Sequence, residues 1–595
     1  MDILCYTRKP KEDIIYAPKL AYSMHLAYRD EGENFIPFHH NEGVLFAKAV
    51  HYGDGTMKAK SLKKPWLFLT GDGRFGVAAV RTEAEGEPDL ESEGSVLLWE
   101  SDDLVHFREM GLLRLQEAGH IRQVRCCFQK EMETYLLEWE REDGTWMKGN
   151  SKNLFAAKEL TDVETRKQPI LQQLDFTDRL SGTIKEIEGV KPGNVIQISK
   201  EKGQYLIHKL LTPKCVDMQR SDTKTAFNEV ELKQIRAIGY YSDGTKVERR
   251  IDWETERGEK PNSNLLRGKV HQEHFSFPIA EYRADPCCIY WRGKYYFIAT
   301  NDFDDNKSLW IRCADNLGGI VGAEEELLLD TTMYPDINGL LWAPEFHEIN
   351  GRLYIFHAAT EGEFFFEESR VMQLKKGGNP MRASDWSKPK LVVKKDGTPL
   401  CEAGKVISLD MTTFQNEEKV YAMWSQRQFL PVDQGAWLYL AEINSDEPWK
   451  LLSNPVCIAK PEYGWENNHT FVVEGPFALK RGGKLMVTYS AAAVDATYTV
   501  GLLGLKEGAD PLKPQSWRKN NYPLLSSRSC HGEYGPGHNS FLEDENGLVW
   551  NFYHARAGLE APRSSGARRV HFDIDQEPML DVLEELDLPE EFREI

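Results

Sequence analysis

Three acidic residues in the second half of the chain have the residue type and setting for acid–base chemistry. Asp285 lies in the segment Arg-Ala-Asp-Pro, Asp410 in Ser-Leu-Asp-Met-Thr-Thr-Phe, and Glu474 in Val-Glu-Gly-Pro. Each stands in or beside a short apolar run that is followed by a turn and a second apolar run. A pair of carboxyl groups can work together, since one donates a proton while the other accepts one. The three segments are therefore candidates for one shared site.

The three carboxylates belong to a longer repeat along the chain. Two further segments continue the series, Trp-Ala-Pro-Glu ending at Glu345 and Gly-His-Asn-Ser containing His538. The intervals between the five successive markers are 60, 65, 64 and 64 residues. This period exceeds that of helical solenoids and suits one four-stranded propeller blade. A turn and a second strand-like run follow every marker, so we predict a five-bladed β-propeller over residues 263–595.

The propeller explains how residues far apart in the sequence meet at one place. The first strand of each blade lines the central axis, and side chains at its start share a funnel. Several carboxylates around one funnel cost free energy through desolvation and mutual repulsion. Glycoside hydrolysis uses such a set, because one carboxylic acid protonates the leaving oxygen while a second carboxylate activates water or attacks carbon. The pattern therefore predicts cleavage of a glycosidic bond.

Residues from about 275 to 575 resemble glycoside hydrolase family 43, the five-bladed propellers that include arabinofuranosidases, xylosidases and arabinanases. The shared marks are Asp-Pro at Asp285, Trp-Ala-Pro before Glu345, Asp410 with Phe414, Glu-Gly-Pro at Glu474, and Gly-His-Asn-Ser at His538. The resemblance implies that Asp285 is the general base and Glu474 the general acid, with Asp410 raising the pKa of Glu474. It also implies inversion, with base and acid about 6.5 to 9.5 Å apart.

The resemblance implies an inverting exo-glycosidase that removes terminal pentose residues. The first candidate is an α-L-arabinofuranosidase acting on oligosaccharides from plant polysaccharides, and a β-xylosidase or an endo-arabinanase of the same family stays open. The related fructosidases are disfavoured, because their Asn-Asp-Pro-Asn and Glu-Cys segments do not stand at the markers. An inactive sugar-binding propeller is the alternative from another class, and the presence of all three carboxylates counts against it.

Further residues near the markers are candidates for substrate contacts. Trp342 and Trp424 flank the acidic segments and have the rings to stack on a sugar, although aromatics also fill propeller cores. Arg283 stands two residues before the proposed base and is a candidate to orient it or to touch substrate. Arg556 and Arg569 on the closing blade are candidates to pair with the central acids. For Arg283, pairing at the surface is the competing interpretation.

His538 and Glu345 have open roles. The resemblance places a histidine near the propeller axis at His538, often beside a bound calcium or a water cluster. Substrate contact, a structural calcium at the axis, and a buried histidine without metal all stay open for it. Glu345 departs from the Asp that often follows Trp-Ala-Pro in relatives, so we expect Glu345 and His347 to be structural. We expect that the reaction requires no cofactor.

The chain as a whole is predicted to be all-β, with 595 residues divided among several domains. Residues 1–165 are predicted to form an accessory propeller-like β domain, since 94–104 resembles half a blade and no marker of the repeat occurs there. Residues 166–262 are predicted to form an Ig-like β-sandwich, from a Ser-Asp-Gly-Thr turn between two strand-like runs. The acidic end, 580–595, is predicted to be a solvated tail or a short helix.

Charge and composition limit the partners. A formal net charge of −20 argues against nucleic acid and anionic membranes, while a neutral oligosaccharide is compatible with it. No apolar run reaches the roughly 18–20 residues of a membrane helix, and the N-terminus lacks the apolar stretch of a secretory signal. The ten cysteines form no CxxC pair. We therefore expect a cytoplasmic protein with reduced cysteines.

Overall fold

The computed structural model describes residues 1–11, 16–32, 34–160, 163–171, 184, 186–222, 229–254 and 267–595. Strands dominate the described part, as the sequence predicts. The chain divides into two compact units, each described separately below. The first holds Met1–Leu211, Pro461–His469 and Asn520–Pro523; the second holds Thr212–Lys460, Thr470–Lys519 and Leu524–Ile595. Among the described residues, no helix has the length and apolar character needed to cross a membrane.

The first unit is built mainly from four-stranded antiparallel sheets. One has the order β14 (Val190–Gln197), β1 (Asp2–Arg8), β2 (His25–Arg29), β3 (Ile36–Pro37). The next two run in chain order: β6 (Lys60–Leu69), β7 (Phe75–Glu83), β8 (Ser95–Ser101), β9 (Phe107–Arg114), and β10 (Ile121–Gln129), β11 (Thr134–Arg141), β12 (Trp146–Ser151), β13 (Val163–Arg166). The pair β4 (Val50–His51) and β5 (Met57–Lys58) and the helices α1 (Pro18–Ala21) and α2 (Lys200–Leu210) complete it. Four-stranded meanders of this kind fit the predicted propeller-like β domain.

The stretch 166–262, predicted as one Ig-like module, is divided between the two units. Strand β14 pairs with β1 and therefore belongs to the first unit. The second unit begins with a four-stranded sheet of β15 (Cys215–Arg220), β16 (Arg236–Tyr241), β17 (Lys246–Glu254) and β18 (Arg267–Val270), with α3 (Glu229–Leu232) between its first two strands. The predicted turn does join β16 to β17, and Asp243 Oδ1 accepts the Thr245 N–H at 3.0 Å. The expected boundary at 262 lies outside the described residues.

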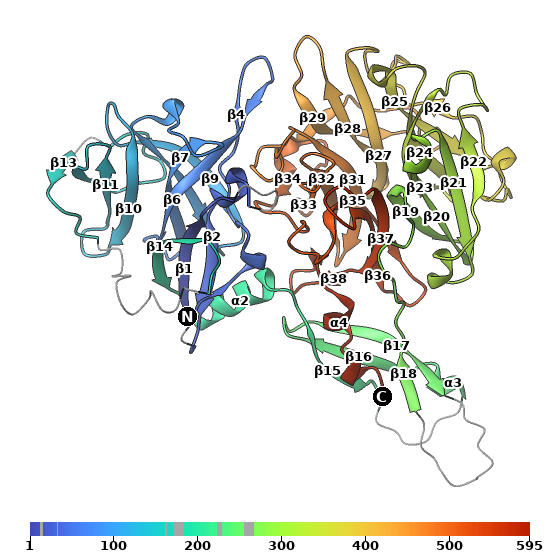
Figure 1. Cartoon of the computed structure of the whole chain (residues 1–595), viewed down its shortest axis with the longest axis horizontal. Helices are drawn as coiled ribbons and strands as arrows, with labels where there is room; N and C mark the ends of the chain where they lie inside the picture. Colours follow the sequence, from blue (N-terminus) through green and yellow to red (C-terminus); the bar gives the residue numbers. More distant parts are fainter. Residues whose placement is uncertain are drawn as a thin grey trace, which may run out of the picture. The chain divides into compact units, whose positions relative to one another are not determined.

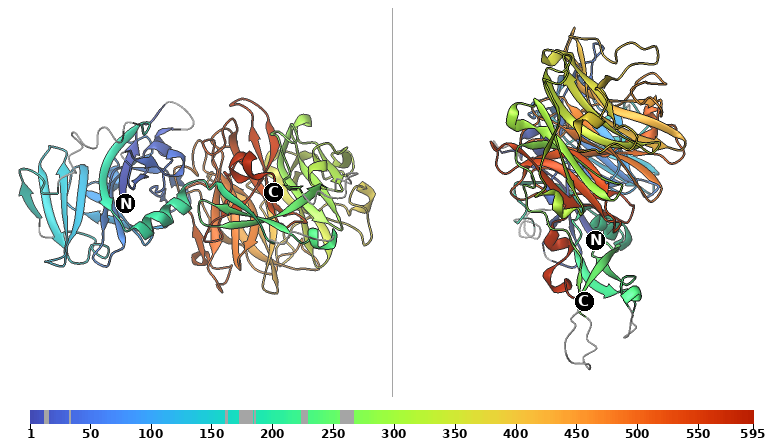
Figure 2. Two further views of the ribbon diagram at one scale, coloured as in Figure 1. Left: turned by 90° about the horizontal axis from the view of Figure 1, so that it is seen from below. Right: turned by 90° about the vertical axis from the view of Figure 1, so that its right-hand side faces the viewer.

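The C-terminal segment packs on this sheet, so of its two predicted forms the solvated tail is wrong and the short helix is confirmed. Ile595 exchanges two backbone hydrogen bonds with Gly268, and Figure 2 shows the C-terminus against the sheet in both views. Helix α4 (Glu584–Asp587) brings Asp587 between Arg249 and Arg569, where all three side chains are buried. A buried carboxylate needs such partners, and they hold the pKa of Asp587 far below its usual value despite burial. The short pair β38 (His571–Phe572) and β39 (Pro578–Met579) leads into this segment.

The rest of the second unit is a five-bladed β-propeller, confirming the prediction from the repeat (Figure 1). Blade one comprises β19 (Arg283–Trp291), β20 (Lys294–Asn301), β21 (Ser308–Ala314) and β22 (Glu326–Asp330). Blades two and three comprise β23 (Gly339–Ile349), β24 (Arg352–Thr360), β25 (Glu367–Gln373), β26 (Lys390–Leu391), and β27 (Val406–Asn416), β28 (Lys419–Gln428), β29 (Gly435–Ile443), β30 (Val456–Ala459). Blades four and five comprise β31 (Val473–Arg481), β32 (Lys484–Ala491), β33 (Thr499–Leu505), β34 (Trp517–Lys519), and β35 (Tyr534–Glu543), β36 (Val549–Arg556), β37 (Arg563–Arg569).

The ring closes through the segment that precedes blade one. Blade five has three strands of its own, and the backbone at Ile279 and Ala280 bonds to Ser565 on its outer strand β37. This contact brings residues from the two ends of the propeller sequence into one blade. Closure of this kind covers a sheet edge that would otherwise be free to pair with another chain.

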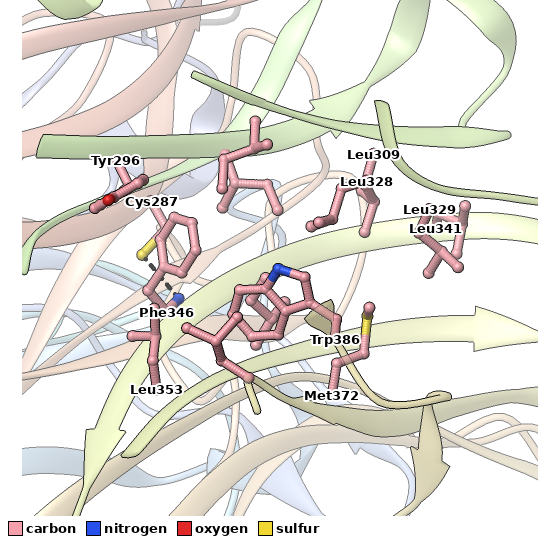
Figure 3. Close-up of a cluster of buried hydrophobic side chains, with 14 of the residues drawn as sticks. Cys287, Tyr296, Leu309, Leu328, Leu329, Leu341, Phe346, Leu353, Met372 and Trp386 are labelled. Carbon is pink, nitrogen blue, oxygen red and sulfur yellow. Dashed lines mark hydrogen bonds between the residues drawn. The ribbon is translucent and has the colours of Figure 1, made fainter. Parts of the chain in front are cut away.

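Apolar side chains pack between successive blades and hold the inner strands at the axis. Figure 3 shows the cluster between blades one and two, where the Phe346 N–H donates to Cys287 Sγ at 3.3 Å. The neighbouring Cys288 belongs to a different cluster, against blade five. Adjacent residues on a strand point to opposite faces, as expected for this cysteine pair. All ten cysteines of the chain are free thiols.

Candidate active site

One backbone feature recurs at the start of the inner strand in every blade. The ladder between the first two strands is interrupted there, and a left-handed φ occurs at the interruption: 51° at Asp285, 46° at Ala343, 55° at Asp410, 52° at Gly475 and 50° at His538. Such a bulge re-aims side chains, and at a residue other than glycine it costs about 1–3 kcal/mol. Strain repeated around an axis marks this end of the propeller as the functional end.

The three predicted carboxylates meet in a cavity at this end. Asp285 from β19, Asp410 from β27 and Glu474 from β31 all line it, and its volume is about 410 Å³. Its apolar wall comes mostly from blades two to four and consists of Trp342, Phe364, Ile407, Leu409, Ala436, Val472 and Val494. Its remaining polar lining consists of Asn306, Arg427, His538 and Arg563. A mostly apolar pocket with a few convergent polar groups is the usual form of a small-ligand site.

Asp285 lies in a basic environment supplied by blades one and five. Its Oδ2 accepts the Thr300 hydroxyl at 2.6 Å, and its Oδ1 lies 3.0 Å from His554 Nδ1. Arg563 Nη1 and His538 Nδ1 each lie 3.3 Å from the same Oδ1. Burial by itself raises the pKa of Asp285, but these neighbours outweigh it and hold the pKa well below 3.8. Asp285 is therefore ionised throughout the neutral range.

Arg563 is the permanent cation of this environment. Burial lowers the pKa of His538 to about 4 and also lowers the pKa of His554, so both imidazoles are neutral at pH 7. Arg563 also makes a two-point ion pair with Asp302, at 2.9 and 2.7 Å. That pair fixes the guanidinium beside Asp285.

Glu474 and Asp410 lie in surroundings that favour the neutral carboxyl, in contrast to those of Asp285. Burial is the largest influence on both, and each carboxyl is further disfavoured as an anion by neighbouring carboxylates. The pKa of Glu474 is raised to about 7, and the pKa of Asp410 is raised well above its usual value. Tyr498 donates to Glu474 Oε1 at 2.8 Å, and the Gly475 N–H donates to Asp410 Oδ2 at 3.0 Å. Near neutral pH this pair therefore holds a proton that it can give.

Tyr498 connects the two environments. Its hydroxyl holds Glu474, while its ring stacks on His554 with centroids 5.4 Å apart and planes 3° from parallel. His554 in turn lies against Asp285, since its Nδ1 is 3.2 Å from the Asp285 backbone nitrogen. The relative placement of the two carboxyls is therefore fixed through packed aromatic rings as well as through the backbone.

The part of the chain that holds this site is similar to known proteins. The model of glycosyl hydrolases family 43 matches residues 275–578. The chain belongs to this family. It is 33% identical to an extracellular exo-α-(1→5)-L-arabinofuranosidase of Streptomyces chartreusis over 47% of this chain and 81% of that protein. It is 34% identical to α-L-arabinofuranosidase B of Pyricularia oryzae over 47% of this chain and 55% of that protein, so it spans about half the length of this relative.

Among solved structures, an α-L-arabinofuranosidase from Lactobacillus brevis is 30% identical, with a TM-score of 0.46. The match covers 51% of this chain and 95% of that one. The resemblance read from the sequence motifs is confirmed by the family match, which includes all five markers of the repeat. The first 274 residues lie outside the matched range.

Two of the predicted substrate contacts of this family-43 chain line the cavity. They are Trp342, whose Nε1 donates to Asn306 Oδ1 at 2.6 Å, and His538. Trp424 is instead fully buried in the cluster between blades two and three, where it fills space as propeller aromatics commonly do. Its neighbour three residues on, Arg427, is the side chain of β28 that lines the cavity.

The three predicted arginines have other partners. Arg283 pairs with Glu325 at 3.1 and 2.6 Å. Arg556 donates to the backbone oxygens of Ala561 and Val494, at 2.6 and 3.0 Å. Arg569 pairs with the C-terminal Asp587, as described above, and not with the central acids. The sequence predicted that an arginine of blade five pairs with a central acid, and in the structure this arginine is Arg563.

Glu345 and His347 lie together beneath the cavity lining. Both are buried, and His347 Nε2 is 2.8 Å from Glu345 Oε2. The left-handed position of blade two is Ala343, so Glu345 stands two residues beyond the structural counterpart of Asp285. Burial raises the pKa of Glu345. The structural role expected for the pair stays a prediction.

A structural calcium at the axis is one of the roles left open for His538. Calcium binds six to eight oxygen ligands. In the part of the chain that the structure describes, no group of three or more His, Cys, Asp or Glu side chains is arranged to hold a metal. His538 offers ring nitrogens, of which Nδ1 is taken up beside Asp285. Its Nε2 is buried without a hydrogen-bond partner among the described residues, so a structural calcium at the axis stays a prediction.

Proposed function

We propose that the chain is an exo-acting α-L-arabinofuranosidase that hydrolyses terminal arabinofuranosyl groups with inversion. The observation that carries the proposal is the opposite displacement of two pKa values in one cavity: Asp285 below its usual range and Glu474 raised to about 7. Two carboxyl groups whose pKa values are shifted in opposite directions are suited to act as base and acid in the same reaction. The names of the relatives support arabinofuranose as the sugar.

The proposed reaction follows from the ionised state of Asp285 and the protonated state of Glu474. A water beside Asp285 attacks the anomeric carbon, and Asp285 takes the proton that this water loses. The bond from that carbon to the leaving oxygen breaks, and Glu474 delivers its proton to that oxygen. Asp285 ends protonated and Glu474 ionised, and exchange with solvent restores both. No covalent sugar–enzyme intermediate forms, so the released sugar has the opposite anomeric configuration.

Asp410 acts on Glu474 and not on the sugar bond. The Glu474 charge raises the pKa of Asp410, so the two carboxyls share a proton near neutrality, while the Asp285 charge helps to raise the pKa of Glu474. The Gly475 N–H fixes Asp410 in place. Any side chain at 475 would be strained, because φ is 52° and a Cβ would lie 3.0 Å from His538 Nδ1.

The test is a substrate panel with product analysis. We expect release of 4-nitrophenol from the α-L-arabinofuranoside, with much slower release from the β-D-xylopyranoside and β-D-galactopyranoside. We expect arabinose as the first product from linear arabino-oligosaccharides, and proton NMR should show the β-anomer first. Xylose release in place of arabinose, internal cleavage, or binding without hydrolysis would each overturn the assignment, as a xylosidase, an endo-arabinanase or a sugar-binding propeller respectively.

A further inference from the structure

A group of exposed aromatic rings continues the cavity outward. Phe364 and Phe365 belong to the short 3₁₀ helix η5 (Phe364–Phe366), which links β24 to β25 in blade two. Phe429 follows β28 in blade three and packs against both, with centroids 5.6 and 5.1 Å away. We call Phe364, Phe365 and Phe429 the aromatic rim. Phe364 and Phe365 are 38% and 42% exposed, although burial of such rings would be favourable.

The rim is continuous with the cavity. Phe364 itself lines the cavity, and its ring lies 6.1 Å from Trp342, which lines the cavity further in. Phe365 lies outside the lining and contacts Phe364 at 5.5 Å. A row of aromatic rings therefore runs from the wall of the site to the protein surface. Grouped apolar side chains that lead out of a pocket mark a binding surface more often than scattered ones do.

The rim is linked to the proton donor through Arg427. The Arg427 guanidinium lies 4.8 Å from the centre of the Phe429 ring and lines the cavity, where its charge acts on Glu474. The partners of Asp285, in contrast, come from blades one and five. Because the donor protonates the leaving oxygen, the leaving part of a substrate departs on the side of Glu474.

The rim is held in a fixed arrangement. Arg427 makes a two-point pair with Asp433, at 3.1 and 2.6 Å, and so anchors the loop that carries Phe429. The Gly404 N–H donates to the backbone oxygen of Phe365 at 2.9 Å. A surface that is already ordered loses little conformational entropy when it binds a ligand.

We propose that the aromatic rim binds the sugar units on the leaving-group side of the scissile bond, so that the enzyme favours oligosaccharides over disaccharides. The C–H face of a sugar ring packs on an aromatic face while its hydroxyls stay in water, which suits rings that are half exposed. The inference rests on the proposed function, and it names an oligosaccharide of three or more units as the substrate class.

The test compares substrate lengths in Phe365→Ala, with Tyr290→Ala as the matched control. Tyr290 is 41% exposed and lies near the far end of β19 from Asp285. In the unaltered enzyme, kcat/KM should rise from arabinobiose to arabinotetraose. In Phe365→Ala we expect kcat/KM to fall roughly ten-fold more for the tetraose than for the biose, the size expected for loss of one aromatic contact. Equal losses for both lengths, no loss, or the same length effect in Tyr290→Ala would overturn the proposal.

A binding measurement separates this proposal from the proposed function. If the unaltered enzyme releases no arabinose from any substrate, the proposed function fails by itself. The rim is then tested by calorimetry on the unaltered chain and on Phe365→Ala, with arabinotetraose and xylotetraose as probes. Weaker binding of either probe by Phe365→Ala supports the rim. Unchanged binding, or binding of neither probe by the unaltered chain, overturns it.

Discussion

The two sides of the cavity place the same functional group in opposite environments. On one side, Asp285 is surrounded by Thr300, His554, His538 and Arg563 from blades one and five. On the other side, Glu474 has Asp410 as a carboxyl neighbour and a single short hydrogen bond from a tyrosine. Both groups are carboxyls that lose solvent, and burial alone raises both pKa values. Only the charged and hydrogen-bonding neighbours separate them.

The role of each carboxyl therefore depends on the side chains that the neighbouring blades place around it, and not on its own residue type. It also sets the pH dependence. Below the lowered pKa of Asp285 the base is protonated and activity is lost. Above about 7 Glu474 loses its proton and activity is lost again. We therefore expect a bell-shaped profile of kcat/KM whose alkaline limb lies near neutrality.

The largest effect is expected from removing the base. Asp285→Asn should lower kcat/KM about 10³- to 10⁴-fold, because no group then takes the proton of the attacking water. The loss should be similar for arabinobiose and for an aryl arabinofuranoside with a good leaving group. Steady-state kinetics on both substrates measure it. Asp315→Asn, at an exposed carboxylate of blade one, is the matched control. Near-normal activity in Asp285→Asn would remove the proposed base.

The next largest effect should depend on the leaving group. Glu474→Gln should lower kcat/KM about 10³-fold for arabinobiose, whose leaving oxygen needs a proton. For the 2,4-dinitrophenyl arabinofuranoside, which leaves without one, the loss should be less than about ten-fold. Glu348→Gln, at an exposed residue of β23, serves as the control. A loss independent of the leaving group would mean that Glu474 is not the acid.

Arg563→Gln tests the basic side of the comparison. Arg563 favours the anion of Asp285, so its removal raises the pKa of Asp285. The acid limb of the kcat/KM profile should move to higher pH, by about 1–2 units, while the alkaline limb moves less. Arg568→Gln removes a neighbouring arginine whose carboxylate partner is Glu533, outside the cavity lining. An acid limb that stays in place in Arg563→Gln would contradict the assigned role.

The smallest effect is expected on the acidic side. The Tyr498 hydroxyl lowers the pKa of Glu474, so Tyr498→Phe raises it and should move the alkaline limb up by about one unit. Activity at the optimum should fall only a few-fold, since the ring still stacks on His554. The control is Tyr553→Phe, which removes a comparable buried tyrosine bond to Glu533. If both variants shift the limb alike, the shift is not a property of the Tyr498 contact.

Much of the fold could be predicted because a propeller repeats its local pattern. Each blade shows its inner strand as an apolar run after a marker, and the near-constant interval fixes the number of blades. The repeat read from the sequence was nevertheless slightly out of register. The left-handed residues that correspond to Asp285 are Ala343 in blade two, two residues before its marker, and Gly475 in blade four, one residue after its marker. Spacing alone cannot find them, because backbone φ at a bulge depends on the pairing with the next strand.

The residues that sequence reasoning missed act through partners on distant strands. Arg563, Tyr498 and His554 stand in no marker. Arg563 and His554 on blade five contact Asp285 of blade one, while Tyr498 holds Glu474 of its own blade and stacks on His554 of blade five. Arg569 shows the converse case. It is an arginine on the closing blade, as expected for a partner of the central acids, yet it pairs with Asp587 near the C-terminus. A pair that joins strands hundreds of residues apart leaves no local signal in a single sequence.

The three carboxyls, the five blades and the family could be predicted from the sequence, because residue types and strand spacing are local properties of the chain. The neighbours of each carboxyl depend on the folded structure. It set Arg563 against Asp285 and Tyr498 and Asp410 beside Glu474, and it placed the aromatic rim at the mouth of the cavity. The physical reason is that burial acts on all these carboxyls in the same direction. Proton donor and proton acceptor are separated only by charges brought close in space.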